Sequence, residues 1–145
     1  MTGVICPYSS VYADDAFNIY RATMHDFVAS AFGWDDTIQR EGFLKTASPK
    51  TCMLCLIGGE CAGFILWKKM PEHIHLQLLC VDQQHQSSGY GSMLLGALRE
   101  VMQNEKLPLL GTILPGNPSW PFYERQGFEA TASENGISIR LTNKG

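Results

Sequence analysis

The chain has 145 residues, the size of one domain that buries roughly 68–70% of its unfolded surface. Hydrophobic residues make up 45% of the chain and charged residues 17%, a composition that excludes a disordered protein. The formal net charge of −3 gives no basic field, which argues against a nucleic-acid partner.

Membrane insertion and export are not expected. The sequence has no apolar run that approaches the roughly 18 residues of a membrane helix. The first seven residues lack a basic region, and their apolar core is too short for a signal peptide. The chain has five cysteines, an odd number that fits free thiols better than a disulfide framework. We therefore expect a single cytoplasmic domain over residues 1–145.

The first third of the chain predicts one short strand and two helices. Residues 4–6 read as the strand. Apolar side chains then recur every three or four residues, which is the period of a helix: Phe17, Tyr20, Met24, Phe27, Val28 and Ala31. Asp35 or Asp36 is suited to cap a second helix.

Two strands at residues 52–57 and 61–68 flank Gly58-Gly59, which is a strong signal for a two-residue hairpin. The second strand is apolar on both faces, so we expect it to be central in a sheet. Cys52 and Cys55 stand three apart, and on a strand such residues point to opposite faces. Small buried hydrophobic side chains are therefore expected there, not a metal or redox pair.

The side chains of the next strand, at residues 73–81, are expected to alternate between the two faces of the sheet. Period two predicts one face with four apolar residues, namely Ile74, Leu76, Leu78 and Cys80. His73, His75 and Gln77 would share the opposite face. Two histidines on one face could bind a metal ion, but no third ligand is evident, so no metal site is predicted.

A polar turn with a glycine pair connects this strand to a helix predicted at residues 88–104. The buried face of that helix is expected to carry Tyr90, Met93, Leu94, Ala97, Leu98, Val101 and Met102. The first N–H groups of a helix have no partner inside it, and the helix dipole adds positive charge at the same point. Gly89 and Gly91 lack Cβ, so an anion can approach these amides closely. The stretch therefore predicts a phosphate site. It is neither a Rossmann fingerprint, because Leu94 replaces the third glycine, nor a P-loop, because Ser92 replaces its lysine.

The last third predicts a strand at residues 107–114, a short helix after Asn117 and a hairpin at residues 128–132 and 137–141. Pro121 fits the first turn of that helix, where no N–H is needed. The whole order is β-α-α-β-β-β-α-β-α-β-β, which indicates an α/β (α+β) domain with a mixed sheet flanked by helices.

Two segments resemble the signatures of the GNAT superfamily of N-acetyltransferases. The run Gln86-Ser87-Ser88-Gly89-Tyr90-Gly91 is similar to Q/R-x-x-G-x-G/A. The second signature of the superfamily is an asparagine followed by a short helix that ends in Y-E-(K/R)-x-G-F. It is matched by Asn117 and the run Tyr123-Glu124-Arg125-Gln126-Gly127-Phe128. The resemblance implies one GNAT-like domain with a mostly antiparallel sheet of about seven strands and about four helices. One departure is Ser88, where the family commonly has arginine or lysine.

The resemblance also implies a function. The donor would be acetyl-CoA, and the acceptor a primary amine of a small molecule or peptide, which attacks the thioester directly. Tyr123 would protonate the leaving thiolate, although a purely structural core tyrosine is the alternative reading. Family members often form homodimers. Cofactor contacts would be made by Leu79, Val81, Gln86, Ser87, Ser88, Gly89, Tyr90, Gly91, Ser92 and Asn117.

Several points stay open at this level. Asn117 reads equally well as a turn residue before Pro118. Many relatives carry a carboxylate base on the central strand, but the corresponding residues here, Gln77 and Leu78, are not basic. His75 is then a candidate base. Alternatively, the acceptor amine has a low pKa and needs no base. Asp35, Asp36 and Glu41 would suit a cationic amine if they border the acceptor. The alternative functions are a non-catalytic acyl-CoA-binding module and a transferase of another acyl group.

Overall fold

The computed structural model describes residues 2–142. Over these residues the predicted order of strands and helices is confirmed, with two short 3-10 helices added, η1 (Ser10–Tyr12) and η2 (Gln83–His85). The strands are β1 (Gly3–Pro7), β2 (Cys52–Ile57), β3 (Glu60–Lys69), β4 (Ile74–Val81), β5 (Leu109–Ile113), β6 (Glu129–Ser133) and β7 (Gly136–Leu141). The α-helices are α1 (Ala13–Phe32), α2 (Asp36–Thr46), α3 (Tyr90–Glu105) and α4 (Trp120–Arg125).

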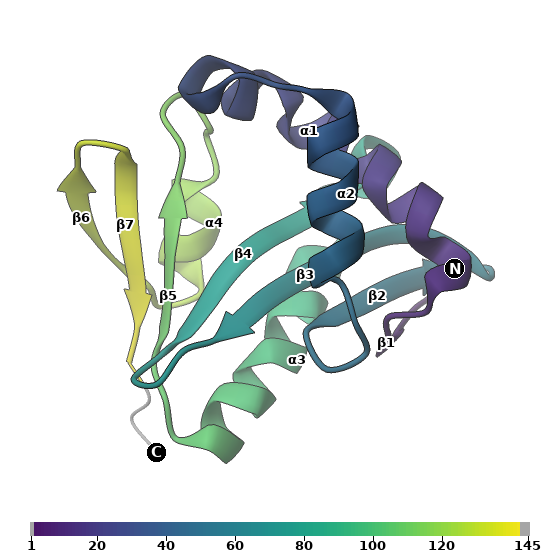
Figure 1. Cartoon of the computed structure of the whole chain (residues 1–145). Helices are drawn as coiled ribbons and strands as arrows, with labels where there is room; N and C mark the ends of the chain where they lie inside the picture. Colours follow the sequence, from purple (N-terminus) through teal and green to yellow (C-terminus); the bar gives the residue numbers. More distant parts are fainter. Residues whose placement is uncertain (1, 143–145) are drawn as a thin grey trace.

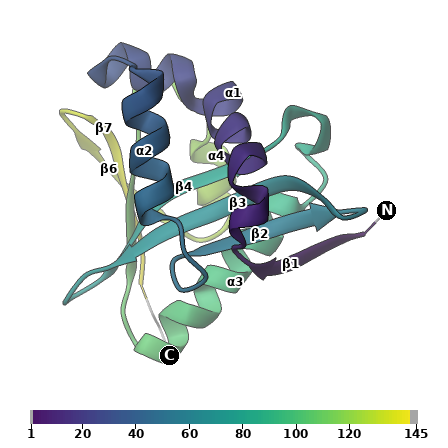
Figure 2. The same ribbon diagram turned by 45° about the vertical axis from the view of Figure 1, so that its right-hand side comes forward.

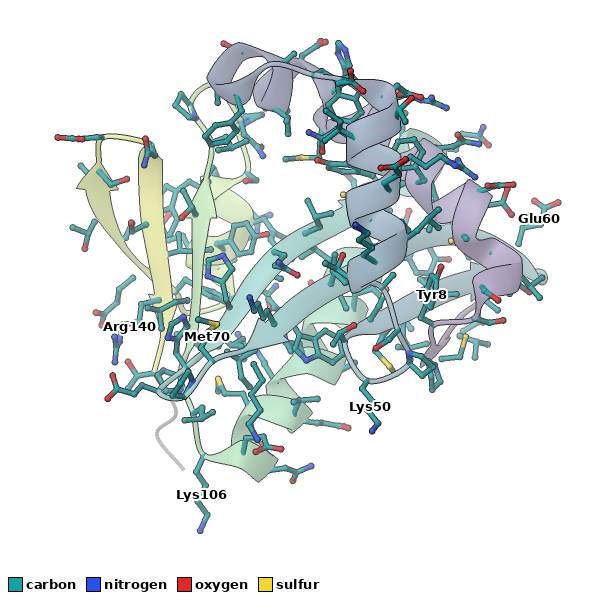
Figure 3. The ribbon with its side chains drawn as sticks, viewed as in Figure 1. Tyr8, Lys50, Glu60, Met70, Lys106 and Arg140 are labelled. Atoms are coloured by element: carbon teal, nitrogen blue, oxygen red, sulfur yellow. The ribbon has the colours of Figure 1, made fainter. Side chains whose placement is uncertain are left out.

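The strands form one seven-stranded sheet in the order β1-β2-β3-β4-β5-β7-β6. Helices α1 and α2 cover one face and α3 covers the other (Figures 1 and 2). Each face has its own hydrophobic core, built around Phe17 and Phe64 on the α1 side and around Leu94 and Ile65 on the α3 side. Charged side chains such as Lys50 and Lys106 project outward (Figure 3). This is the predicted α/β architecture.

Strands β4 and β5 are the only parallel neighbours among the described strands, and they pair over a short length. Their ladder has three residue pairs, from Ile74 with Leu109 to Leu76 with Gly111. Beyond Leu76 the two strands diverge, and the sheet opens into a wedge between them (Figure 1).

A β-bulge at Gln77 lies at the point where this wedge begins. Leu66 of β3 pairs with Leu78, but the next residue, Trp67, pairs with Leu76, so Gln77 is an extra residue. An extra residue reverses the alternation of the strand beyond it.

The single apolar face predicted for β4 is therefore wrong. Ile74 and Leu76 pack into the core on the α3 side, whereas Leu78 and Cys80 pack into the core on the α1 side. The bulge moves the side chains that follow it to the other face, so both faces of the strand are apolar beyond Gln77.

The other local predictions are confirmed in most cases. Gly58 and Gly59 have φ of 59° and 83°, as a type I′ hairpin turn requires. Cys52 and Cys55 belong to the two different cores, so they do point to opposite faces. The Asp35 carboxylate accepts a hydrogen bond from the N–H of Ile38 at 3.0 Å, which caps α2.

The predicted buried faces of two helices need correction. Ala31 of α1 is exposed, although Phe17, Tyr20 and Val28 are buried as expected. In α3, Met93 is 39% exposed, and Leu95 is fully buried in its place. Both residues are apolar, so the pattern did not reveal which of the two neighbours faces the sheet.

Close packing of β3 against β4 at Gly63 gives a first prediction. A Cβ at Gly63 would lie 2.7 Å from the carbonyl oxygen of Cys80, so Gly63→Ala should lower the free energy of unfolding by about 1–3 kcal/mol. Gly96→Ala is the matched control. It places the Cβ in open space within α3 and should raise stability by about 0.5–1 kcal/mol. Urea unfolding measures both, and equal stability of the two variants would contradict the prediction.

Candidate functional site

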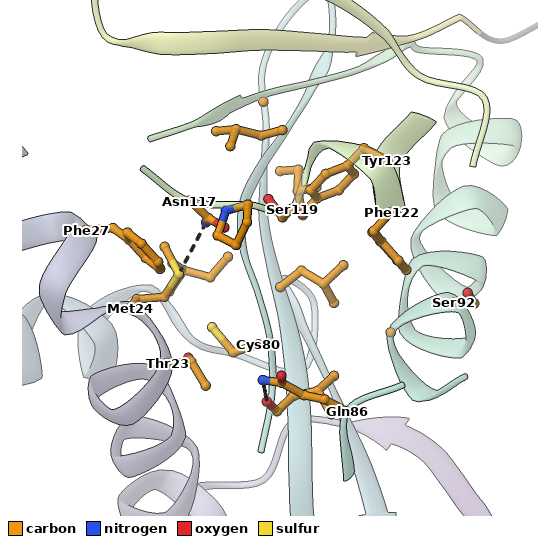
Figure 4. A pocket seen from close by; sticks show the side chains of 18 of the residues that line it. Thr23, Met24, Phe27, Cys80, Gln86, Ser92, Asn117, Ser119, Phe122 and Tyr123 are labelled. Carbon is orange, nitrogen blue, oxygen red and sulfur yellow. Dashed lines mark hydrogen bonds between the residues drawn. The ribbon is translucent and has the colours of Figure 1, made fainter. Parts of the chain in front are cut away.

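A cavity of about 750 Å³ occupies the wedge between β4 and β5. One wall is the diverging part of β4, from Leu78 to Val81, and the opposite wall is the end of β5 with the start of α4. Helix α1 contributes Met24 and Phe27, which face Phe122 and Tyr123 across the cavity (Figure 4). The splayed strands therefore create a space that reaches both faces of the sheet.

The turn between β4 and α3 forms one end of the cavity. The Gln86 side chain donates a hydrogen bond from Nε2 to the Val81 carbonyl at 2.9 Å, which folds the turn back onto the strand (Figure 4). Ser87 and Gly89 have φ of 64° and 90°, and alternation of this kind makes a concave run of backbone amides. The amides of Gly91 and Ser92 follow in the first turn of α3, where N–H groups have no partner within the helix.

Most of the residues that the sequence assigns to cofactor binding are brought together here. Those that line the cavity are Leu79, Val81, Gln86, Ser87, Gly89, Gly91, Ser92 and Asn117. Ser88 and Tyr90 belong to the same turn but do not line the cavity. The Tyr90 ring lies against the His85 ring, and a Cβ at Gly3 would lie 2.6 Å from it. Tyr90 thus packs the start of α3 against β1.

Tyr123 enters the cavity from α4. It is only 9% exposed, and its ring packs edge-on against Phe122 and Phe128 with centroids 5.1 and 5.3 Å away. Burial raises the pKa of Tyr123 well above its ordinary value. No hydrogen bond between described residues involves its hydroxyl group, so the proton of the phenol is available to a bound molecule.

Helix α4 is held against the start of α3. Gln126, just after α4, donates from Nε2 to the Ser92 hydroxyl at 3.0 Å, and its carbonyl accepts a hydrogen bond from Arg99. These contacts fix the position of Tyr123 relative to the amide-rich turn. Arg125 also lines the cavity and brings a cation to it.

Cys80 lies inside the cavity but is poorly suited as a nucleophile. The side chain is 2% exposed, and burial raises the pKa of its thiol to about 12, although Thr23 lowers it slightly by a hydrogen bond. A thiol of that pKa carries almost no thiolate at neutral pH.

His75, the base that the sequence left as a candidate, does not line this cavity or the smaller one beside it. It pairs with Leu110 in the closed part of the sheet, and burial lowers its pKa, with smaller contributions from His73 and Lys68. Over residues 2–142, no three His, Cys, Asp or Glu side chains are placed to share a metal ion.

The sequence did not identify which residues of α1 form a wall of the cavity. Met24 and Phe27 fit the helical stripe and were expected in the core, but they are half-buried at the cavity, where the Asn117 amide contacts the Met24 sulfur at 3.9 Å. His85 was also missed. No signal in the sequence separates a core position from a cavity wall, because both favour apolar side chains.

Comparison with known proteins identifies the fold and the family. The family model described as "Acetyltransferase (GNAT) family" matches residues 13–128, which is most of the chain. The chain belongs to the GNAT acetyltransferase family. A search of curated protein sequences finds no match. Members of this family use acetyl-CoA, so the transferase and acyltransferase classes apply.

Solved structures share the GNAT fold at low sequence identity. PaiA N-acetyltransferase from Thermoplasma acidophilum, in complex with coenzyme A, is 14% identical with a TM-score of 0.77 and covers 99% of both chains. The ribosomal-protein-S18-alanine N-acetyltransferase from Escherichia coli is 18% identical with a TM-score of 0.76, covering 99% of this chain and 97% of its own. Ard1 from Thermoplasma volcanium is 17% identical with a TM-score of 0.77, covering 99% and 100%.

Proposed function

We propose that this protein is an N-acetyltransferase that moves an acetyl group from acetyl-CoA to a primary amine in a ternary complex. The observation that carries the proposal is one continuous cavity that joins a turn rich in backbone amides to the hydroxyl group of Tyr123. Family membership and the coenzyme A bound to the Thermoplasma acidophilum relative support the choice of donor.

The amide-rich turn would hold the diphosphate of acetyl-CoA. Hydrogen bonds from backbone N–H groups to charged oxygens contribute about 1.5–3 kcal/mol each, and the dipole of α3 adds about 0.3–1 kcal/mol. Gly89 and Gly91 let the anion approach, and Arg125 supplies a positive charge at the cavity. Together these groups compensate for Ser88, which stands where relatives have a cation.

The open edge of β4 would position the reactive end. Beyond Leu76, β5 no longer pairs with β4, so the N–H and C=O groups of Leu79 and its neighbours on that side have no strand partner. Bound there, acetyl-CoA would supply the thioester. A backbone N–H such as that of Leu79 would stabilise the negative charge that develops on the carbonyl oxygen.

Tyr123 would donate the proton that the leaving sulfur needs. Its raised pKa keeps the phenol protonated throughout the physiological pH range. The same low-dielectric surroundings also destabilise the leaving thiolate and so raise the pKa of its thiol. Transfer of the Tyr123 proton to the sulfur is therefore less unfavourable than the raised pKa of Tyr123 alone would suggest. The raised pKa of the Cys80 thiol supports direct transfer, because a thiol with little thiolate is a poor nucleophile for an acetyl-enzyme route.

A binding and turnover assay tests the proposal. Calorimetry should show saturable binding of CoA, and thiol release from acetyl-CoA should depend on an added amine from a panel of peptides and small amines. Absence of saturable binding would overturn the proposal. Binding without turnover of any amine would indicate an acyl-CoA-binding module instead, and faster turnover of another acyl-CoA would indicate a different acyl group.

The cysteines bear on the location of the protein. All five are unpaired in the structure, and free thiols persist in a reducing compartment, so we propose that the protein is cytoplasmic. Among residues 2–142, no helix combines the length and the apolar character needed to cross a membrane.

A further inference from the structure

The charge of the cavity walls restricts the acceptor. Among the described residues, none of those that line the main cavity is an aspartate or a glutamate. The ionisable side chains among them are Cys80, His85, Tyr123 and Arg125. The part of the wall that α1 and the bulge contribute is apolar or neutral, with Met24, Phe27, Thr23, Gln77 and Leu78.

A second, smaller cavity extends this neutral surface. It has a volume of about 220 Å³, lies between α1, α2 and β4, and shares Gln77 and Leu78 with the main cavity. The Tyr20 hydroxyl within it donates a hydrogen bond to Gln39 at 2.9 Å, and burial raises the pKa of Tyr20 to about 12, so it is uncharged. None of the described side chains that line this smaller cavity is charged.

Two of the three acidic residues that the sequence placed at the acceptor border already have partners within the fold. Asp35 caps the helix at the N–H of Ile38, and Asp36 forms an ion pair with Arg21 at 2.9 Å. Hydrogen bonds from Trp34 and then Arg21 lower the pKa of Asp36. Neither carboxylate lines either of these two cavities, and Glu41 does not either, so none of them is placed to neutralise a cationic acceptor there.

From this we propose that the acceptor is an amine of low pKa that has a substantial neutral fraction at neutral pH, the α-amine of a peptide, and not a lysine side chain or a polyamine. The inference rests on the proposed acetyl transfer and names the acceptor of that same site. It requires an acceptor that supplies its own neutral nitrogen and needs no counter-charge from the wall.

The proton count supports this choice. The neutral nitrogen attacks the carbonyl carbon, a C–N bond forms, and the C–S bond breaks with its electron pair on sulfur, which takes the Tyr123 proton. The attacking nitrogen then carries one extra proton, which returns to the Tyr123 oxygen, so the side chain ends as it began. A protonated amine brings one more proton, and no carboxylate among the described residues lines the cavity to take it. His85 is the remaining candidate base among the lining residues, and the His85→Gln variant removes it.

The difference in amine pKa sets the size of the effect. An α-amine has a pKa of about 7.7–8.0 and a lysine amine about 10.4, so at pH 7 the neutral fraction differs by about 300-fold. The enzyme should therefore prefer the α-amine by about that factor in kcat/KM at pH 7. The preference should shrink as pH rises, because the lysine amine then loses its proton.

A matched pair of peptides tests the inference. Both have the same sequence with one lysine; in the first only the α-amine is free and the lysine is acetylated, and in the second only the lysine amine is free. The expected result is a kcat/KM about 300-fold higher for the first peptide at pH 7, with a pH profile that follows the acceptor amine. Glycinamide, an α-amine without a chain, should show the same pH profile, and its kcat/KM relative to the peptide tells whether a peptide or a small amine is the natural source.

Equal or faster transfer to the lysine amine or to spermine at pH 7 would overturn the inference and leave the proposed function standing. A pH dependence of kcat/KM that disappears in His85→Gln would also overturn it, because an enzyme base would then prepare the acceptor. Lack of transfer to every amine despite CoA binding is a different result, since it would contradict the proposed function itself.

Discussion

Replacing Tyr123 with phenylalanine is expected to lower kcat by about 10²-fold, because general acid catalysis typically contributes 10²–10⁴-fold. The substitution removes one hydroxyl group and leaves a ring that still packs against Phe122 and Phe128. No described residue hydrogen-bonds to that hydroxyl, so thermal stability and the Kd for CoA should stay close to the wild-type values. Steady-state kinetics of thiol release, together with calorimetry, measure these three quantities.

Tyr8→Phe is the matched control for this experiment. Tyr8 is also buried in an aromatic core, with its ring edge-on to Phe43, but it lies outside both cavities. Loss of the Tyr8 hydroxyl group should leave kcat unchanged. Wild-type kcat in Tyr123→Phe would mean that Tyr123 is a core tyrosine only, and a comparable loss in both variants would point to a packing effect.

Gly91→Asp is expected to weaken CoA binding by at least about tenfold. The new Cβ would lie 3.4 Å from the Phe122 ring, an ordinary contact, so the side chain fits. A carboxylate in the first turn of α3 interacts favourably with the helix dipole, by about 0.3–1 kcal/mol, and should not lower the melting temperature. It would repel a diphosphate at the cavity, because two like charges about 4 Å apart near a protein surface repel by about 4 kcal/mol.

The control for this variant is Met93→Asp, which adds the same charge to the first turn of the same helix. Met93 is partly exposed and does not line the cavity, so the Kd for CoA should change much less. Calorimetric titration of both variants with CoA, at fixed ionic strength, makes the comparison. Unaltered affinity in Gly91→Asp would show that the diphosphate is held elsewhere.

The sequence was sufficient for the architecture because its local signals agree with one another. Gly58-Gly59 specifies a hairpin whose strands need no distant information, and Asp35 marks the start of α2 through a cap that involves only its neighbours. The turn before α3 was recognisable for the same reason, since the anion site arises from backbone geometry within a few residues. The placement of Gln86, Gly89 and Gly91 around one cavity follows from that local conformation.

The remainder depends on contacts between distant segments. The bulge at Gln77 depends on how β4 pairs with β3, and no residue type in the strand indicates that a bulge will form there. The residues of α1 that form the cavity wall could not be predicted, because Met24 and Phe27 obey the same periodicity as the core residues of that helix. Burial of Tyr123 likewise depends on the packing of α4 against the sheet, which the motif alone does not describe.

The short ladder between β4 and β5 divides the sheet into two halves that share three residue pairs. Few backbone hydrogen bonds therefore join the two halves at the cavity, and the contact of Gln126 with Ser92 is a side-chain link between α4 on one side and α3 on the other. A sheet joined over so short a length can separate at one end and stay paired at the other, which lets one domain hold a long ligand between strands of the same sheet.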